Sequence, residues 1–238
     1  MFSRTKCFLI ATSEFTIVRK IALRAPETCS EMRFILKKYR YMLHAWFVDH
    51  ACLRFFWSNK DKISSNSFAL RSGHPSLLAL KKFKREGGKY VLNLRGGRKR
   101  PANLIEKCIC KREGLKLINI PLRSTRAPSK KSILELIEFF QNVDAPFLVH
   151  CKTGADRTGL AAAIYLLSID DCELEDAIKQ LHIRYLHFGF GEKKILKKFF
   201  EYLGATRSEP QSLYAWARDT YEPSELIDWI TTKNEIVK

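Results

Sequence analysis

The sequence predicts an α/β fold, in which a mostly parallel central sheet is flanked by helices. Three observations support this prediction. Short apolar runs alternate with amphipathic helical segments, glycines and serines mark the ends of these segments, and no linker rich in Pro, Gly or Ser divides the chain. Strands that alternate with helices form parallel sheets, because parallel neighbours need a long crossover connection. At 238 residues and 46% hydrophobic, the chain can bury one substantial core.

Each predicted strand is a short apolar run that follows a glycine or a proline. The predicted strands are residues 90–94, 115–120 and 147–149. Each predicted helix begins after a strand or a turn and repeats its apolar residues with a period near 3.6. The predicted helices are residues 76–85, 102–112, a segment from 129 onward, the apolar run 160–167, and residues 174–181, 192–203 and 212–221.

The helix that begins at Ser129 illustrates the reasoning. Ser129 is a preferred N-cap residue, because its hydroxyl can accept a hydrogen bond from an unpaired amide in the first turn. Ile133, Leu136, Ile137 and Phe140 then recur at helical spacing and form one apolar stripe. We expect this stripe to pack against the sheet.

The most informative segment is the block from residue 150 to residue 159, which reads HCKTGADRTG. It places Cys151 and Arg157 six positions apart, after an apolar strand and before the apolar, alanine-rich run 160–167. A loop of this length allows successive backbone N–H groups to point at one bound phosphate, and the helix that follows adds the positive end of its dipole. The same groups stabilise a thiolate, so we expect the Cys151 pKa to lie below the free value of about 8.5.

Each position in this block has a predicted role. Cys151 is the nucleophile, Arg157 clamps the phosphoryl group with two parallel hydrogen bonds, and Gly154 allows the backbone to turn. The predicted phosphate-binding residues are Lys152, Thr153, Gly154, Ala155, Asp156 and Arg157. We expect His150 and Thr158 to support the loop, Thr158 by stabilising the sulfur and His150 by bonding loop carbonyls. The alternative is a buried cysteine in a tight turn that happens to precede an arginine.

The block resembles the signature of the cysteine-dependent protein tyrosine phosphatase superfamily, in its dual-specificity and atypical bacterial branch. The segments RSGHP at 71–75 and VLNLRG at 91–96 are similar to further motifs of atypical bacterial members, and the resemblance covers about residues 68–203. It implies a phosphoric monoester hydrolase that forms a phosphocysteine intermediate and needs no cofactor or metal. We therefore expect a partly helical N-terminal extension, residues 1–67, and a phosphatase catalytic domain, residues 68–238.

The chain departs from this family where a general acid is expected. Members of the family usually carry an aspartate on a mobile loop, here residues 121–128, and this loop contains no carboxylate. Asp156 is the best substitute, because a bound phosphate would raise its pKa, as an acid requires. The alternative is that Asp156 merely orients Arg157 or a neighbouring amide. Glu135 and Glu138 are weaker candidates, since their helical positions face solvent.

Two functional hypotheses follow. The first is a phosphatase of the tyrosine or dual-specificity type, with a phosphorylated protein or a phospholipid as substrate. The second is a catalytically weak phosphate-binding module that recognises phosphorylated partners or acidic lipid, which the missing acid leaves open. We expect the loop 185–191 to border the substrate cleft, with His187 as a packed residue in it.

The charge is uneven along the chain. Residues 1–130 hold 29 Lys and Arg against 8 Asp and Glu, and residues 131–238 hold 13 against 17, which together make the net charge of +17. This asymmetry favours a polyanionic partner, such as an anionic membrane surface contacted peripherally, whereas no nucleic-acid-binding motif accompanies it. The densest cluster is Arg95, Arg98, Lys99 and Arg100. A solvated basic face without function is the alternative.

The N-terminal residues carry little further information. No secretion signal is recognisable, and charged residues interrupt the aromatic segment 41–57, so we expect a helix packed on the core or an interfacial helix with basic flanks at 33–40. Seven cysteines without paired spacing indicate reduced thiols. We therefore expect a cytoplasmic protein, peripheral at the membrane if the basic region binds it.

Overall fold

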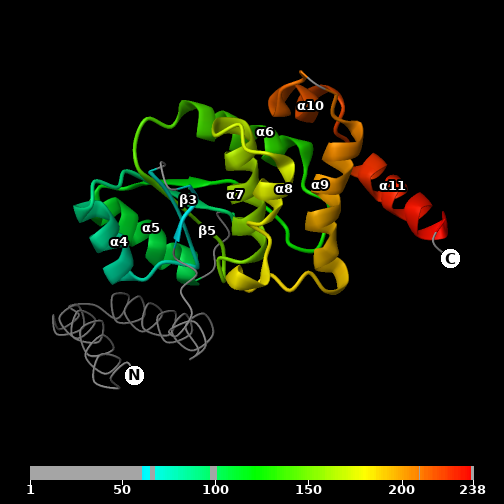
Figure 1. Ribbon diagram of the computed structural model, residues 1–238. Coiled ribbons are helices and arrows are strands. Elements are labelled where there is room, and N and C mark those ends of the chain that lie inside the picture. Colours follow the sequence, from blue (N-terminus) through cyan, green and yellow to red (C-terminus); the bar gives the residue numbers. More distant parts are fainter. Residues whose placement is uncertain (1–60, 65–67, 97–100, 209, 237–238) are drawn as a thin grey trace, which may run out of the picture. The chain divides into compact units, whose positions relative to one another are not determined.

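The computed structural model describes residues 61–64, 68–96, 101–208 and 210–236 (Figure 1). The chain divides into two compact units, Met1–Ala51 and Cys52–Lys238, and the described residues all belong to the second. The interpretations of segments 33–40 and 41–57 therefore lie outside the described residues. None of the described helices is long and apolar enough to cross a membrane.

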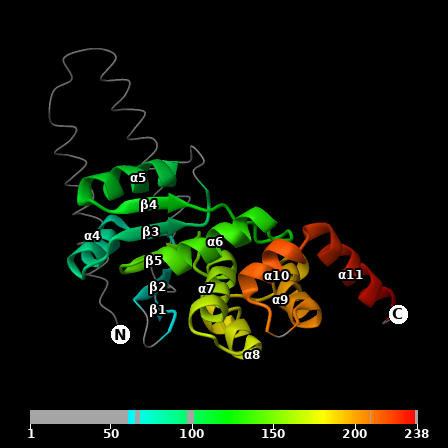
Figure 2. The same cartoon turned by 90° about the horizontal axis from the view of Figure 1, so that it is seen from above.

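A five-stranded sheet forms the centre of this unit, with the strand order β1-β2-β5-β3-β4 (Figure 2). The strands are β1 (Asp61–Lys62), β2 (Ala69–Ser72), β3 (Tyr90–Asn93), β4 (Lys116–Asn119) and β5 (Phe147–His150). β1 pairs antiparallel with β2, and every other pair is parallel. His150 aligns with Ser72 on one side and Asn93 on the other, so the carboxyl ends of β2, β5 and β3 meet at one edge.

Helices cover both faces of the sheet (Figure 1). They are α4 (Leu77–Arg85), α5 (Pro101–Glu113), α6 (Lys130–Asn142), α7 (Asp156–Ile169), α8 (Leu174–Ile178), α9 (Ile195–Thr206), α10 (Leu213–Asp219) and α11 (Pro223–Ile236), with the 3-10 turns η2 (Ile183–Tyr185) and η3 (Gly191–Lys194). Because strand side chains alternate between faces, Val91 and Leu148 pack with α4 and α5, whereas Leu92, Phe147 and Val149 pack with α6 and α7. The predicted fold class is confirmed.

Capping residues and apolar periodicity in the sequence predicted most of these helices and strands. The Ser129 hydroxyl accepts from the Ser132 amide at the start of α6, and the predicted stripe of that helix is buried. The Ser76 hydroxyl caps α4 in the same way. The elements that were not predicted are β1, β2, the 3-10 turn η2 and α11. β1 lies before residue 68, so the sheet begins upstream of the expected boundary.

Candidate phosphate-binding loop

The block 150–159 lies at the carboxyl edge of the sheet. β5 ends at His150, the loop runs from Cys151 to Ala155, and α7 begins at Asp156. α7 is buried along most of its length, with every residue from Leu160 to Leu167 in the core. The strand and this central helix hold both ends of the loop, and the helix N-terminus faces it.

Residues from β2 and the turn after it determine the direction of the loop peptides. The Arg71 guanidinium is fully buried and donates from Nη2 to the Gly154 carbonyl at 2.8 Å, and the His74 amide donates to the Lys152 carbonyl at 3.2 Å. In a trans peptide, the N–H of the next residue points opposite to the carbonyl. The N–H groups of Thr153 and Ala155 therefore point away from β2. An anion bound on that opposite side of the loop would accept hydrogen bonds from them.

Arg71 is itself fixed by its surroundings. Its Nη1 donates to both the backbone and side-chain oxygens of Gln180, and the guanidinium lies 3.6 Å from the centre of the Tyr185 ring. Desolvation by burial lowers the Arg71 pKa to about 10, so the group is still charged at neutral pH. The structural role of Arg71 was not predicted from the sequence, where this residue is only the first position of the segment 71–75.

Two glycines of the block are needed for close backbone approach. Gly154 has φ of +75°, and a Cβ there would lie 2.6 Å from the Gly73 nitrogen and 2.7 Å from the Ser72 carbonyl carbon. The positive φ agrees with the predicted backbone turn, and a side chain at Gly154 would also collide with the backbone after β2. At Gly159 a Cβ would lie 2.7 Å from the Gln180 carbonyl oxygen, so this glycine lets α7 approach the turn after α8.

The Cys151 sulfur is buried, and its surroundings favour the thiolate. Burial opposes ionisation and is the largest single influence on its pKa, but Arg157, the Thr158 hydroxyl and the amides of Thr158 and Gly154 together outweigh burial. The Cys151 pKa is therefore lower than that of an ordinary cysteine. Among the described residues the buried Thr158 hydroxyl has no nitrogen or oxygen partner, so it is available to the sulfur. The Nε of Arg157 is also buried without a partner among these residues.

Asp156 is placed differently from the expectation for an acid. Its Oδ1 accepts from His187 Nδ1 at 2.8 Å, and its Oδ2 lies 3.1 Å from Lys193 Nζ. Burial raises the pKa of this carboxyl, but the bonds to His187 and Lys193 outweigh burial and lower the pKa below its usual range. His187 and Lys193 therefore favour the carboxylate form of Asp156 in the structure described, whereas the pKa rise expected from a bound phosphate stays a prediction. The prediction that His187 is packed is confirmed, since 2% of its surface is exposed.

A buried polar network lies behind the loop. Glu106 Oε1 lies 2.5 Å from His150 Nε2, and Asn93 Nδ2 donates to Glu106 Oε2 at 2.6 Å. His150 Nδ1 lies 3.2 Å from the Cys151 carbonyl oxygen, which can only accept. The network therefore connects strand β3 and helix α5 to the backbone of Cys151. Glu106 was not predicted from the sequence, because a glutamate in a helix normally faces solvent.

The same network contains the closest grouping of metal-ligand atoms in the described part of the chain. One ligand atom each from His74, Glu106 and His150 lies within 4.8 Å of the other two. At 2.5 Å, Glu106 Oε1 and His150 Nε2 lie closer together than two ligand atoms of one tetrahedral zinc ion would. The arrangement favours a hydrogen-bonded pair over a metal centre.

The loop 121–128, in which the family's general acid is missing, follows β4 and runs along the same edge of the sheet. The Leu122 amide donates to the Leu94 carbonyl at 3.0 Å, which holds the start of the loop beside the end of β3. The loop exposes Arg123 and Arg126 and has no carboxylate. Glu135 is half-buried and Glu138 is exposed, where it accepts a hydrogen bond from the Tyr214 hydroxyl. Arg95 is buried, and its companions at 98–100 lie outside the described residues.

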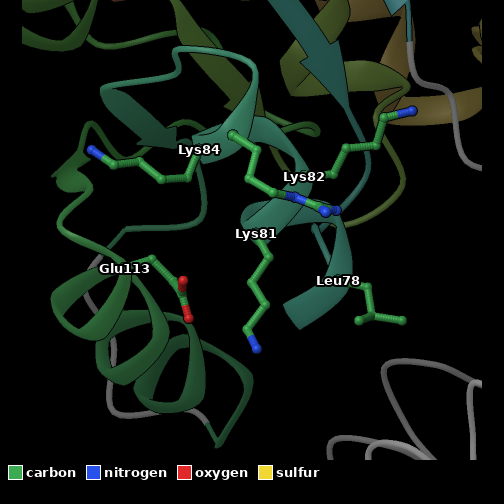
Figure 3. Close-up of a pocket in the computed structure, with 6 residues that line it drawn as sticks. Leu78, Lys81, Lys82, Lys84 and Glu113 are labelled. Carbon is green, nitrogen blue, oxygen red and sulfur yellow. The ribbon is translucent and has the colours of Figure 1, made fainter.

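A shallow hollow between α4 and α5 contains none of the predicted site residues (Figure 3). It is lined by Leu78, Lys81, Lys82, Lys84, Arg85 and Glu113. The amino groups of Lys82 and Lys84 point in opposite directions, so the lining does not converge on one ligand (Figure 3). The candidate site is therefore the loop 151–157.

Comparison with known families agrees with this geometry. Residues 47–196, more than half of the chain, match the family described as DSP-PTPase phosphatase fused to NAD+ kinase. The chain belongs to this family. Its membership confirms the resemblance to cysteine-dependent tyrosine phosphatases.

Individual relatives are distant. The dual specificity protein phosphatase TpbA of Pseudomonas aeruginosa is 25% identical over 91 residues, which are 37% of this chain and 39% of TpbA. The matched segment thus spans well under half the length of that relative. Among solved structures, a putative phosphatase from Shewanella putrefaciens CN-32 has a TM-score of 0.53 at 16% identity and covers 67% of this chain and 98% of its own.

The catalytic core of the PP-IP phosphatase Siw14 from S. cerevisiae has a TM-score of 0.50 at 17% identity and covers 75% of this chain and 94% of its own. At such identities, the likeness of both solved structures concerns the fold alone. It confirms the mixed sheet with helices on both faces.

Proposed function

We propose that this chain hydrolyses phosphate monoesters through a phosphocysteine intermediate on Cys151. The observation that carries this proposal is the environment of the Cys151 sulfur, where Arg157, a hydroxyl and two amides outweigh burial and lower its pKa. A thiolate is the nucleophilic form of cysteine, and the loop that stabilises it also presents N–H groups to a phosphate. Family membership supports a phosphatase, and the relatives' names support a phosphorylated substrate.

In the first step, the Cys151 thiolate attacks phosphorus and the ester P–O bond breaks, so that the leaving oxygen takes the electron pair; an acidic leaving group departs as its anion, and a more basic one takes a proton from solvent water. In the second step, water attacks phosphorus and the S–P bond breaks with its electron pair on sulfur. The thiolate is restored, and both protons of the water leave with the product as dihydrogen phosphate. Arg157 and the loop amides stabilise the flattened phosphoryl group in both steps. The Thr158 hydroxyl stabilises the sulfur as it departs in the second step.

Asp156 acts in this proposal as a positioning residue. Its two basic partners favour the carboxylate, whereas a general acid must carry a proton at the working pH. The carboxylate fixes the start of α7, next to Arg157, against the segment 187–193. Esters with acidic leaving groups are therefore the best substrates, because they need no protonation as they leave.

The test is phosphate release by purified wild type and Cys151→Ser from an acidic aryl phosphate, a phosphotyrosine peptide and a phospholipid phosphate. We expect turnover of the aryl phosphate by wild type and none by Cys151→Ser, together with phosphocysteine trapped by rapid acid quench. The second candidate is a phosphate-binding module, favoured by the carboxylate-free loop 121–128. Tight phosphate-analogue binding without turnover of any ester would favour this module and exclude the enzyme.

A further inference from the structure

The most exposed apolar side chains of the described residues lie within one short segment of the chain, residues 183–190. Phe190, Ile183 and Phe188 are 75%, 58% and 52% exposed, and no other large hydrophobic side chain in the described part of the chain exceeds 46%. The two phenylalanine rings are nearly parallel, with an angle of 11° and a centroid separation of 6.4 Å. Contiguous exposed apolar groups mark interaction sites, whereas isolated ones do not.

This loop is held against the phosphate-binding loop at both ends. His187 and Lys193 bind the two carboxylate oxygens of Asp156, which precedes Arg157 directly. The segment between these two contacts contains Phe188 and Phe190. Gly189 and Gly191, with φ of +62° and +56°, adopt left-handed conformations there. The exposed rings therefore belong to a closed loop tied to the candidate active site.

Basic side chains surround these rings. Residues 182–198 contain five Lys and Arg and one Glu, a net charge of +4. Lys194 and Lys197 are exposed and make no ion pair with any described residue. A Cβ at Gly189 would lie 4.0 Å from Lys197 Cε, so this lysine stem passes beside the backbone between the two phenylalanines. Aromatic rings flanked by cations fit an anionic lipid interface, where the rings enter the boundary region and the cations meet headgroups.

We propose that Phe188 and Phe190 insert into the surface of an anionic phospholipid bilayer. Resting on the proposed phosphatase function, we further infer that the substrate is a phosphate monoester on a lipid headgroup. Because Asp156 joins this loop to the phosphate-binding loop, insertion holds the reacting groups at headgroup level. A protein partner fits less well, since a stable protein interface covers about 800 Å² per partner and this patch consists of two phenylalanine side chains.

The first experiment measures binding of the full chain to sedimented vesicles, in a Cys151→Ser background that prevents turnover. Vesicles of phosphatidylcholine alone are compared with vesicles containing about 30% phosphatidylglycerol. We expect binding to the anionic vesicles that salt weakens, and at least about tenfold weaker binding by Phe188→Ser/Phe190→Ser. The matched control is Ile227→Ser on α11, which removes a side chain of 46% exposure and leaves binding unchanged.

The second experiment measures hydrolysis with an active Cys151. Phe188→Ser/Phe190→Ser retains wild-type turnover of a soluble aryl phosphate and loses about tenfold on a phosphomonoester lipid in vesicles. Circular dichroism confirms that the variant is folded. The membrane contact is overturned if wild type does not bind anionic vesicles, or if the double variant binds them as tightly as wild type does. Vesicle binding without lipid hydrolysis, when the aryl phosphate is still turned over, overturns only the lipid substrate. If wild type does not hydrolyse the aryl phosphate, the proposed phosphatase function is refuted.

Discussion

Replacing Asp156 with asparagine tests whether this residue positions the site or donates a proton. The substitution removes the charge from a bond to His187 in which the two side chains are 0% and 12% exposed. A hydrogen bond to a charged group contributes about 1.5–3 kcal/mol, and the half-exposed Lys193 adds at most about 1 kcal/mol. Because asparagine keeps one acceptor oxygen for His187, we expect the free energy of unfolding to fall by about 1–3 kcal/mol.

This stability difference depends on pH in a defined direction. The folded-state pKa of Asp156 is lowered, so its contribution is fully present above the unfolded value of about 3.9 and is lost as pH falls through the folded value. Urea unfolding of wild type and Asp156→Asn should therefore differ most at neutral pH. The two proteins should converge in acid below the lowered pKa.

The kinetic assay compares an aryl phosphate that has an acidic leaving group with an alkyl phosphate. A positioning role predicts that kcat/KM of Asp156→Asn falls by a similar factor on both esters, and that His187→Asn reproduces this loss. A general acid contributes about 10²–10⁴-fold to rate, and only where the leaving group needs a proton. Unchanged turnover of the aryl phosphate together with a hundredfold loss on the alkyl phosphate would refute the positioning role.

Three further predictions concern the loop and its support. Thr158→Val removes a donor from the Cys151 thiolate, so the midpoint of iodoacetamide alkylation against pH should rise by about one unit; an unchanged midpoint would contradict the assigned contact. Gly154→Ala places a Cβ 2.6 Å from the Gly73 nitrogen at a positive φ, and should cost about 2–4 kcal/mol in urea unfolding and abolish turnover, whereas wild-type stability would be inconsistent with the close approach. Glu106→Ala breaks a buried pair and should lower the free energy of unfolding by about 3–5 kcal/mol. Glu106→Gln keeps an acceptor oxygen and should lower it by less. Equal losses in the two variants would contradict a contribution from the hydrogen bond that glutamine keeps.

The parts of this protein that were predictable depend on neighbours in the sequence. The Ser129 cap and the stripe of α6 involve groups three or four positions apart, and the structure matches both. The strand, loop and helix around Cys151 likewise follow from an uninterrupted block. β1 and β2 were missed because neither is a continuous apolar run: β1 consists of Asp61 and Lys62, and β2 ends in Arg71 and Ser72.

The role of Asp156 shows what sequence reasoning lacked. From its position beside Arg157, an effect of bound phosphate on its pKa was expected, and the partners 31 and 37 residues away were not visible. Arg71 shows the same limit, since it contacts Gly154 and Gln180, which lie 83 and 109 residues farther along the chain. No local pattern encodes such contacts.

The fold class and the strand, loop and helix around Cys151 could be predicted from the sequence, because periodicity and an unbroken motif are properties of adjacent residues. Tertiary structure alone decided the protonation preference of Asp156, the burial of Arg71 and Glu106, and the exposure of Phe188 and Phe190. A pKa, a buried charge and an exposed ring each depend on which groups the folded chain brings within a few ångströms. These groups are far apart in the sequence and become neighbours only in the folded chain.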